Sequence, residues 1–271
     1  MKLAVWLVRP EGLDIGKKLS AELGAALIEP WLKPANQNEQ FALTFRQYQG
    51  WIIIGTTGIA VRFLDGLTAD KHTDPAVVVV DEGGRFAVSL LSGHEGGAND
   101  LAFQAASALG AMPVVTTATE SLKPLVLGIG CRRGASADAI ESAVALALGS
   151  LNSSGASLQR LAQVRHVATI DLKKDEPGLL EFCARHQLPL HVIKATDVAA
   201  RSWVTKGSDW VKQVTGAPGV CEPCALMSSL RGQLLVPKLA HAGVTVAVAG
   251  DELAVSEAEP AMVQAEVGGE K

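Results

Sequence analysis

Short runs of consecutive apolar residues alternate with helix-like patterns along almost the whole chain, and this alternation restricts the fold more than any other feature. The segments WIII at residues 51–54 and AVVVV at residues 76–80 are apolar at every position. Strands of this kind are covered on both faces, as in parallel sheets flanked by helices. The sequence therefore predicts an α/β fold with mainly parallel sheets, in which ligand loops follow the carboxyl ends of strands.

One interruption of this alternation divides the chain into two predicted α/β domains. Strands are expected at 3–9, 51–55, 76–81, 85–91 and 112–116, and helices at 12–25, 39–48, 57–67 and 97–109. The polar stretch 116–124 ends in proline and is typical of a linker. The pattern then restarts, with strands at 125–130, 164–170, 189–194, 233–237 and 243–249 and helices at 136–148, 177–186 and 222–230. We expect domains over residues 1–120 and 124–250, and an acidic, disordered tail over 251–271.

Composition and charge exclude several classes of function. The net charge of −4 and the aromatic content of 4% argue against a nucleic-acid partner. No apolar run reaches the roughly 18–20 residues of a membrane span, and the first residues predict a strand rather than an export signal. Four cysteines in such a chain indicate a reduced, cytoplasmic protein. Cys221 and Cys224 lack a second close pair, so packing is favoured over a metal or redox site.

The first candidate loop, residues 55–62, joins a predicted strand to a helix. Free N–H groups at the start of a helix favour an anion, and Arg62 lies in the first turn. Thr56, Thr57, Gly58 and Arg62 are therefore candidate ligand-binding residues. The alternative is that Thr57 only caps the helix.

The second candidate loop, residues 92–99, is the densest in glycine and polar residues. Three glycines surround His94, and no structural requirement for so much glycine is evident in the sequence. We therefore expect a functional loop, in which the backbone approaches a ligand and His94 points into a cleft. The candidates for catalysis are His94 and Ser92, with Glu82 in the predicted turn 81–85. The candidates for binding are Gly93, Gly96, Gly97 and Asn99.

The third candidate loop, residues 128–134, resembles a dinucleotide fingerprint only superficially. The spacing is G-x-G-x-x-x-G and two arginines occupy the loop, so a nucleotide-dependent oxidoreductase is not favoured. Arg132 and Arg133 instead suit carboxylates, together with Gly130 and Cys131. Glu222 and Lys238 are expected at a similar strand edge. We expect these loops to face a single cleft.

A resemblance to a known family extends over nearly the whole chain. In the N-terminal half it rests on the segments TTGIAVR, DKHTDPAVVVVDEGGRFAVSLLSGHEGGANDLA and PVVTTAT. In the C-terminal half it rests on LGIGCRRG, ATIDLKKDEPGL, GVCEPCALMSS, LLVPK and GVTVAVA. They resemble the CbiG family, the cobalt-precorrin 5A hydrolases of anaerobic cobalamin biosynthesis. Members of that family are often longer, with an extra segment between their two domains.

The resemblance implies a substrate and a reaction. The substrate is a cobalt-bearing, ring-contracted tetrapyrrole whose δ-lactone is opened with release of acetaldehyde, giving cobalt-precorrin 5B. No protein-bound cofactor or metal is implied, since the cobalt arrives with the substrate, and neighbouring pathway enzymes are the expected partners. His94 would act as general base or polarise the lactone, N–H groups of Gly96 and Gly97 would hold the oxyanion, and Glu82 or Glu222 would be the alternative base. The competing hypothesis is a tetrapyrrole-binding or carrier protein without chemistry.

Overall fold

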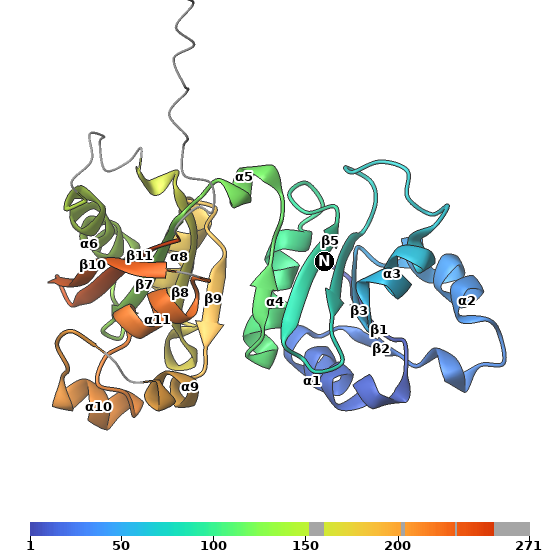
Figure 1. The fold of residues 1–271 in the computed structure, drawn as a ribbon, viewed down its shortest axis with the longest axis horizontal. Helices are drawn as coiled ribbons and strands as arrows, with labels where there is room; N and C mark the ends of the chain where they lie inside the picture. Colours follow the sequence, from blue (N-terminus) through green and yellow to red (C-terminus); the bar gives the residue numbers. More distant parts are fainter. Residues whose placement is uncertain (152–159, 202–203, 231, 252–271) are drawn as a thin grey trace, which may run out of the picture.

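The apolar runs at residues 51–54 and 76–80 form central strands of a six-stranded sheet, which we call the first sheet (Figure 1). The computed structural model describes residues 1–151, 160–201, 204–230 and 232–251. The strand order is β2-β1-β3-β4-β5-β6. The bounds are β1 Leu3–Leu7, β2 Ala26–Ile28, β3 Gly50–Ile54, β4 Ala76–Val80, β5 Phe86–Leu91 and β6 Met112–Val114. All residues of β1, β3 and β4 are buried, as expected between two helical layers.

The last two strands of the first sheet run opposite to the other four. β4 and β5 pair antiparallel, with Val80 opposite Ala87 and Val77 opposite Leu91. The loops that follow the carboxyl ends of β3 and β5 therefore lie on opposite sides of the sheet, at opposite ends of its strands. The expectation that these two loops face one cleft is wrong, because the tight turn at residues 81–85 reverses the chain between them.

Helices cover both faces of the first sheet. α1 (Leu13–Leu23) and α4 (Ala98–Leu109) pack on one face, where Leu19 and Leu101 join the core. α2 (Gln37–Thr44) and α3 (Thr57–Leu64) pack on the other, where Phe41 and Phe63 surround Trp6. Short 3₁₀ helices occupy Pro10–Gly12, Pro30–Leu32 and Phe45–Gln47.

The second sheet has the order β10-β11-β7-β8-β9, with β7, β8 and β9 parallel and β10 and β11 antiparallel. Its bounds are β7 Leu125–Cys131, β8 Val164–Ile170, β9 Leu190–Ile193, β10 Gly232–His241 and β11 Val244–Asp251. α6 (Ala137–Gly149) and α8 (Pro177–Arg185) cover one face. α9 (Ala195–Ala200), α10 (Asp209–Thr215) and α11 (Cys221–Met227) contribute to the core on the other. A 3₁₀ helix at Asp171–Lys173 follows β8.

The α4 helix lies between the two sheets and joins them (Figure 1). Its alanines pack on the first sheet, whereas Phe103 and Ser107 face the second. The Ser107 hydroxyl accepts a hydrogen bond of 2.9 Å from the backbone N–H of Val192 in the edge strand β9. Ser107 in the first half of the chain thus provides an acceptor for a backbone N–H of an edge strand in the second half, which has no neighbouring strand on that side.

The predicted α/β class with mainly parallel sheets is confirmed. Besides 3₁₀ helices, four elements were not predicted: β2, α9, α10 and α5 (Ala118–Ser121), which lies in the expected linker. Each is short and lacks a long apolar run. Asp251, predicted to begin the tail, instead ends β11 and binds Arg165 and the N–H of Leu230. The rest of the predicted tail, 252–271, lies outside the described residues.

Candidate active site

The loop that follows β5 turns the chain sharply from strand to helix. Ser92 has a φ of 55°, and its carbonyl oxygen accepts hydrogen bonds of 3.1 Å from the N–H groups of Gly96 and Ala98. Left-handed backbone at a non-glycine residue is uncommon and concentrates at functional sites. The Ser92 hydroxyl is buried and has no hydrogen-bond partner among the described residues. Its predicted catalytic role stays a prediction.

Each glycine of this loop has a structural reason. A Cβ on Gly93 would lie 2.8 Å from Oδ1 of Asn99, and a Cβ on Gly96 would overlap the Ser92 side chain. Gly97 has a φ of 85°. The turn itself requires these glycines, so the prediction that they serve only function is wrong. The N–H of Gly96 binds Ser92, so it is not free for an oxyanion, whereas the N–H of Gly97 has no acceptor among the described residues.

Asn99 fastens the loop to its surroundings. Its Oδ1 accepts from the Ser89 hydroxyl at 2.9 Å, and its Nδ2 donates to the Thr117 hydroxyl at 3.2 Å. Its backbone N–H donates to the carbonyl of Gly93 at 3.0 Å. Asn99 lines the cleft described below, but its amide already ties together β5, the loop and the segment before α5. The amide therefore positions the loop.

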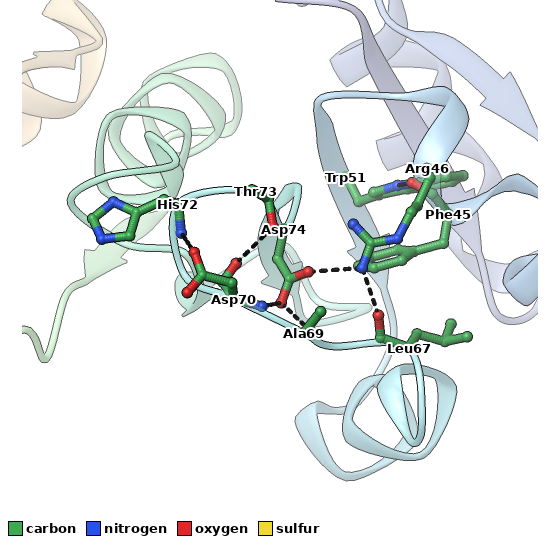
Figure 2. A network of polar contacts seen from close by, with 9 residues as sticks. All are labelled: Phe45, Arg46, Trp51, Leu67, Ala69, Asp70, His72, Thr73 and Asp74. Carbon is green, nitrogen blue, oxygen red and sulfur yellow. Dashed lines mark hydrogen bonds and ion pairs between the residues drawn. The ribbon is translucent and has the colours of Figure 1, made fainter.

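A second loop, residues 65–75, supports the His94 loop from outside. The buried Asp74 carboxylate accepts from Arg46 at 2.9 Å and from two N–H groups of its own loop at 2.8 and 3.1 Å (Figure 2). Desolvation of this carboxyl opposes ionisation, but the N–H donors and the Arg46 charge lower the pKa of Asp74 overall. Beside it, Lys71 Nζ lies 2.7 Å from the carboxylate of Glu95. Glu95 therefore binds the supporting loop.

A cleft of ≈ 1160 Å³ lies between the two halves of the chain and follows α4. The α4 residues that line it extend from Asn99 to Ala108, a length of about 14 Å at 1.5 Å per residue. The facing wall is partly apolar and includes Leu188, Leu190 and Val192. Ligand pockets usually enclose roughly 300–1,000 Å³, so this cleft admits a large ligand.

His94 lies exposed at one end of this cleft, together with Asp100, Glu120 and Lys123. Glu120 and Lys123 form an ion pair of 2.7 Å. Desolvation raises the pKa of Asp100, the Glu120 charge raises it further, and His94 opposes the rise. An imidazole beside a carboxyl group can take a proton from water and be stabilised as imidazolium.

A buried polar cluster fixes the far side of α4. The Ser228 hydroxyl lies 2.6 Å from Nε2 of His166 and 2.6 Å from Nδ1 of His191, and Phe103 packs against both rings. One hydroxyl therefore bonds both rings, and Nδ1 of His166 has no partner among the described residues. Burial lowers the pKa of His191 to about 4 and that of His166 well below its usual value.

The first candidate loop lies at the opposite edge of the first sheet from His94. Thr56, rather than Thr57, caps α3 by accepting from the N–H of Ile59 at 3.3 Å. Thr57, Gly58 and Arg62 are exposed, and Arg62 lies in the last turn of α3 rather than in the predicted first turn. A separate cavity of ≈ 530 Å³ there includes Glu82. The Glu82 carboxylate binds Arg9. Glu82 as an alternative base for the His94 site is therefore wrong, because the chain reverses at the turn that contains it.

The third candidate loop has structural glycines and exposed arginines. Gly130 lies inside β7, where a Cβ would be 2.8 Å from the Thr245 hydroxyl oxygen. Arg132 and Arg133 are exposed, and neither lines the cleft. Desolvation raises the pKa of the half-buried Cys131 thiol.

Glu222 and Lys238 form a structural contact rather than a part of the cleft. The buried Glu222 carboxylate accepts from the backbone N–H groups of Thr205 and Lys238, both at 2.9 Å, and from the Thr205 hydroxyl. Glu222 as the alternative base is not supported, because its oxygens hold two chain segments together. Cys221 and Cys224 are free and buried at the start of α11, and burial raises the pKa of the Cys221 thiol to about 11.

Sequence reasoning missed several cleft residues, namely Lys18, Asp100, Glu120, Lys123 and Lys194. Asp100 directly follows the predicted loop, and its place in the first helical turn could have marked it. The others come from distant elements and share no local motif. Among the described residues no cluster of three metal-ligating side chains is found, and no described helix is long and apolar enough to cross a membrane.

Two relatives with named functions match most of this chain, and a third relative matches less than half of it. A cobalt-precorrin-5A hydrolase from Salmonella typhimurium LT2 is 28% identical over 346 residues, covering 90% of this chain and 96% of that protein. One from Priestia megaterium is 28% identical over 303 residues, covering 76% and 79%. Protein CobE from a Sinorhizobium species is 34% identical over 128 residues, covering 46% and 79%.

Family models match both halves of the chain. The model for the N-terminal part of cobalamin synthesis protein G matches residues 39–120, which include the His94 loop and the α4 wall of the cleft. The model for the C-terminal part matches residues 125–249, which include the facing wall. The two matches leave only a few residues between them. With both halves matched in order, this chain belongs to the cobalamin synthesis G (CbiG) family.

Proposed function

We propose that this protein is a cobalt-precorrin-5A hydrolase, which opens the lactone of a ring-contracted cobalt tetrapyrrole and releases acetaldehyde. The observation that carries the proposal is the cleft along α4, which has an apolar wall and an acid–base end at His94. A large, flat macrocycle with carboxylate arms needs a cleft of this size and mixed character. Relatives that bear this name match 76% and 90% of this chain.

In this proposal His94 takes a proton from the water that attacks the lactone carbonyl carbon. The N–H of Gly97, free among the described residues, is the donor for the oxyanion that forms on the carbonyl oxygen. The lactone C–O bond breaks, leaving a carboxylate arm and an alkoxide. The alkoxide collapses to acetaldehyde, and its carbon–carbon bonding pair passes into the cobalt-bearing macrocycle. The second proton of the attacking water, left on the new carboxyl group, and the proton on the imidazolium both pass to solvent.

Asp100 supports His94 in this proposal. It lines the same end of the cleft and interacts electrostatically with His94. A negative charge there stabilises the imidazolium that forms as water is deprotonated. Asp100 therefore stabilises the protonated base electrostatically.

The same proposal includes the protein's surroundings. The cobalt arrives within the substrate, so no resident cofactor is invoked, and neighbouring pathway enzymes are the expected protein partners. A reducing, cytoplasmic location is supported by the four cysteines, all of which are free thiols.

Turnover of the isolated lactone substrate tests the proposal against the carrier alternative. Purified protein is mixed with cobalt-precorrin 5A, and acetaldehyde is measured as a function of time. A hydrolase releases about one acetaldehyde for each substrate molecule over many turnovers. Tight binding with no acetaldehyde above the protein-free control would instead establish a carrier.

A further inference from the structure

The cleft along α4 carries cations on three separate elements. Lys18 comes from α1, Lys174 follows the 3₁₀ helix after β8, and Lys194 caps α9 after β9. None of these three forms an ion pair within 4.0 Å with a residue that the structure describes. The fourth lysine of the cleft, Lys123, is paired with Glu120.

The carboxylates of the cleft do not cancel these cations as local pairs. Glu120 is bound by Lys123, and an Asp171 oxygen accepts from the N–H groups of Leu172 and Ala195 at 3.0 and 3.1 Å. Glu22, Asp100 and Asp175 complete the set of acids in the cleft. An anionic arm is repelled by these acids and attracted by the lysines, so the charges favour particular orientations of a ligand.

The apolar wall lies among these charged groups. Phe103, Leu188 and Val192 line the same cleft as the lysines. A flat apolar ring with carboxylates around its periphery is complementary to an apolar wall with separated ammonium groups. Lysine suits single flexible carboxylate arms, because its ammonium is a compact charge with three rotatable donors.

We propose that Lys18, Lys174 and Lys194 bind the carboxylate arms of the substrate and thereby place its lactone at His94. This inference rests on the proposed function and replaces Arg62, Arg132 and Arg133, which lie outside the cleft, as the carboxylate-binding residues. The three lysines set the orientation of the macrocycle, and His94 carries out the proton transfer.

Replacement of each lysine by glutamine tests this inference with matched controls. Lys17→Gln in the same helix as Lys18, and Lys212→Gln in α10, remove the same charge from positions that do not line the cleft. Binding of the purified corrinoid product is followed by its visible absorbance, at low and at physiological salt. Acetaldehyde release gives KM and kcat for the lactone substrate.

We expect each cleft variant to weaken product binding and raise KM roughly 5- to 10-fold, with kcat within about 3-fold of wild type. The salt dependence of binding should decrease in each cleft variant, because fewer charge contacts are screened. The control variants should behave as wild type. If the cleft variants bind the product as tightly as the controls do, the inference is overturned while the proposed function stands. If wild-type protein neither binds the corrinoid nor releases acetaldehyde, the proposed function fails as well.

Discussion

The Ser228 hydroxyl oxygen lies 2.6 Å from Nδ1 of His191, and this contact ties the end of α11 to the strand on which α4 packs. Ser228 also bonds His166, so one hydroxyl satisfies two buried rings. Phe103 of α4 packs against both rings, so these contacts cross from one half of the molecule to the other. The cluster therefore fixes the position of α4, which forms one wall of the cleft.

Ser228→Ala should lower the free energy of unfolding by about 1–3 kcal/mol, since it leaves two buried imidazoles without a partner. Chemical denaturation at pH 7.5 measures the change. Ser150→Ala is a suitable control, because that hydroxyl donates to a carbonyl within its own helix end. Equal changes in the free energy of unfolding for the two substitutions would show that the cluster stabilises the fold no more than an ordinary helix-end hydrogen bond does.

Stability should fall as the pH drops from about 6.5 toward 4. Burial lowers the pKa of His191 from 6.5 to about 4 in the folded protein, so in this window the unfolded chain binds more protons. The loss from His191 alone approaches about 3 kcal/mol at the lower end. The free energy of unfolding of wild type and of His191→Gln is compared across this pH range. The variant should show a smaller slope, and identical slopes would contradict the assignment of a buried neutral His191.

Gly128→Ala should destabilise the fold by about 3 kcal/mol or more, because α11 packs directly on β7 at this residue. A Cβ there would overlap the carbonyl oxygen of Cys221, a backbone atom that cannot rotate away. Gly149→Ala provides the contrast, since a Cβ at the end of α6 meets no atom within 4 Å. Thermal unfolding of both variants checks this, and a similar Tm for both would refute the close approach.

The structure explains which features could be predicted from the sequence and which could not. The apolar runs that alternate with helical patterns predict an α/β fold with mainly parallel sheets. A buried strand can be recognised from its own residues, without knowledge of distant contacts. The His94 loop was placed correctly at the carboxyl end of a strand, but the glycine argument for it fails, since Gly93 and Gly96 serve the turn itself. The turn at residues 81–85 was also predicted, yet its consequence, the reversal of β5, was not.

The cleft depends on packing that no local pattern encodes. Its wall forms because Phe103 and Ser107 on α4 meet β9, more than eighty residues away in the chain. Lys18, Lys174 and Lys194, which line it, come from α1 and from the segments after β8 and β9, so no motif unites them. The arginines were conspicuous in the sequence because two are adjacent in a loop, but that loop borders the β10–β11 turn at Gly243.

Asp100→Asn should lower kcat roughly tenfold and leave KM nearly unchanged, because the side chain keeps its shape but loses the charge that stabilises protonated His94. Asp175→Asn, at a carboxylate of the same cleft on the other half of the chain, is the matched control. Acetaldehyde release gives both parameters. Equal kcat values in the two variants would refute the proposed role of Asp100 in stabilising protonated His94.

The most direct test of the central claim is acetaldehyde release from cobalt-precorrin 5A by wild type, His94→Ala and His94→Gln. The exposed position of His94 predicts that both variants fold as wild type, which circular dichroism and product binding verify. We predict that both reduce kcat by roughly 10²–10⁴-fold, because neither side chain can take a proton from water. Near-normal acetaldehyde release by His94→Gln would contradict the account, since that side chain can form hydrogen bonds but cannot serve as the base.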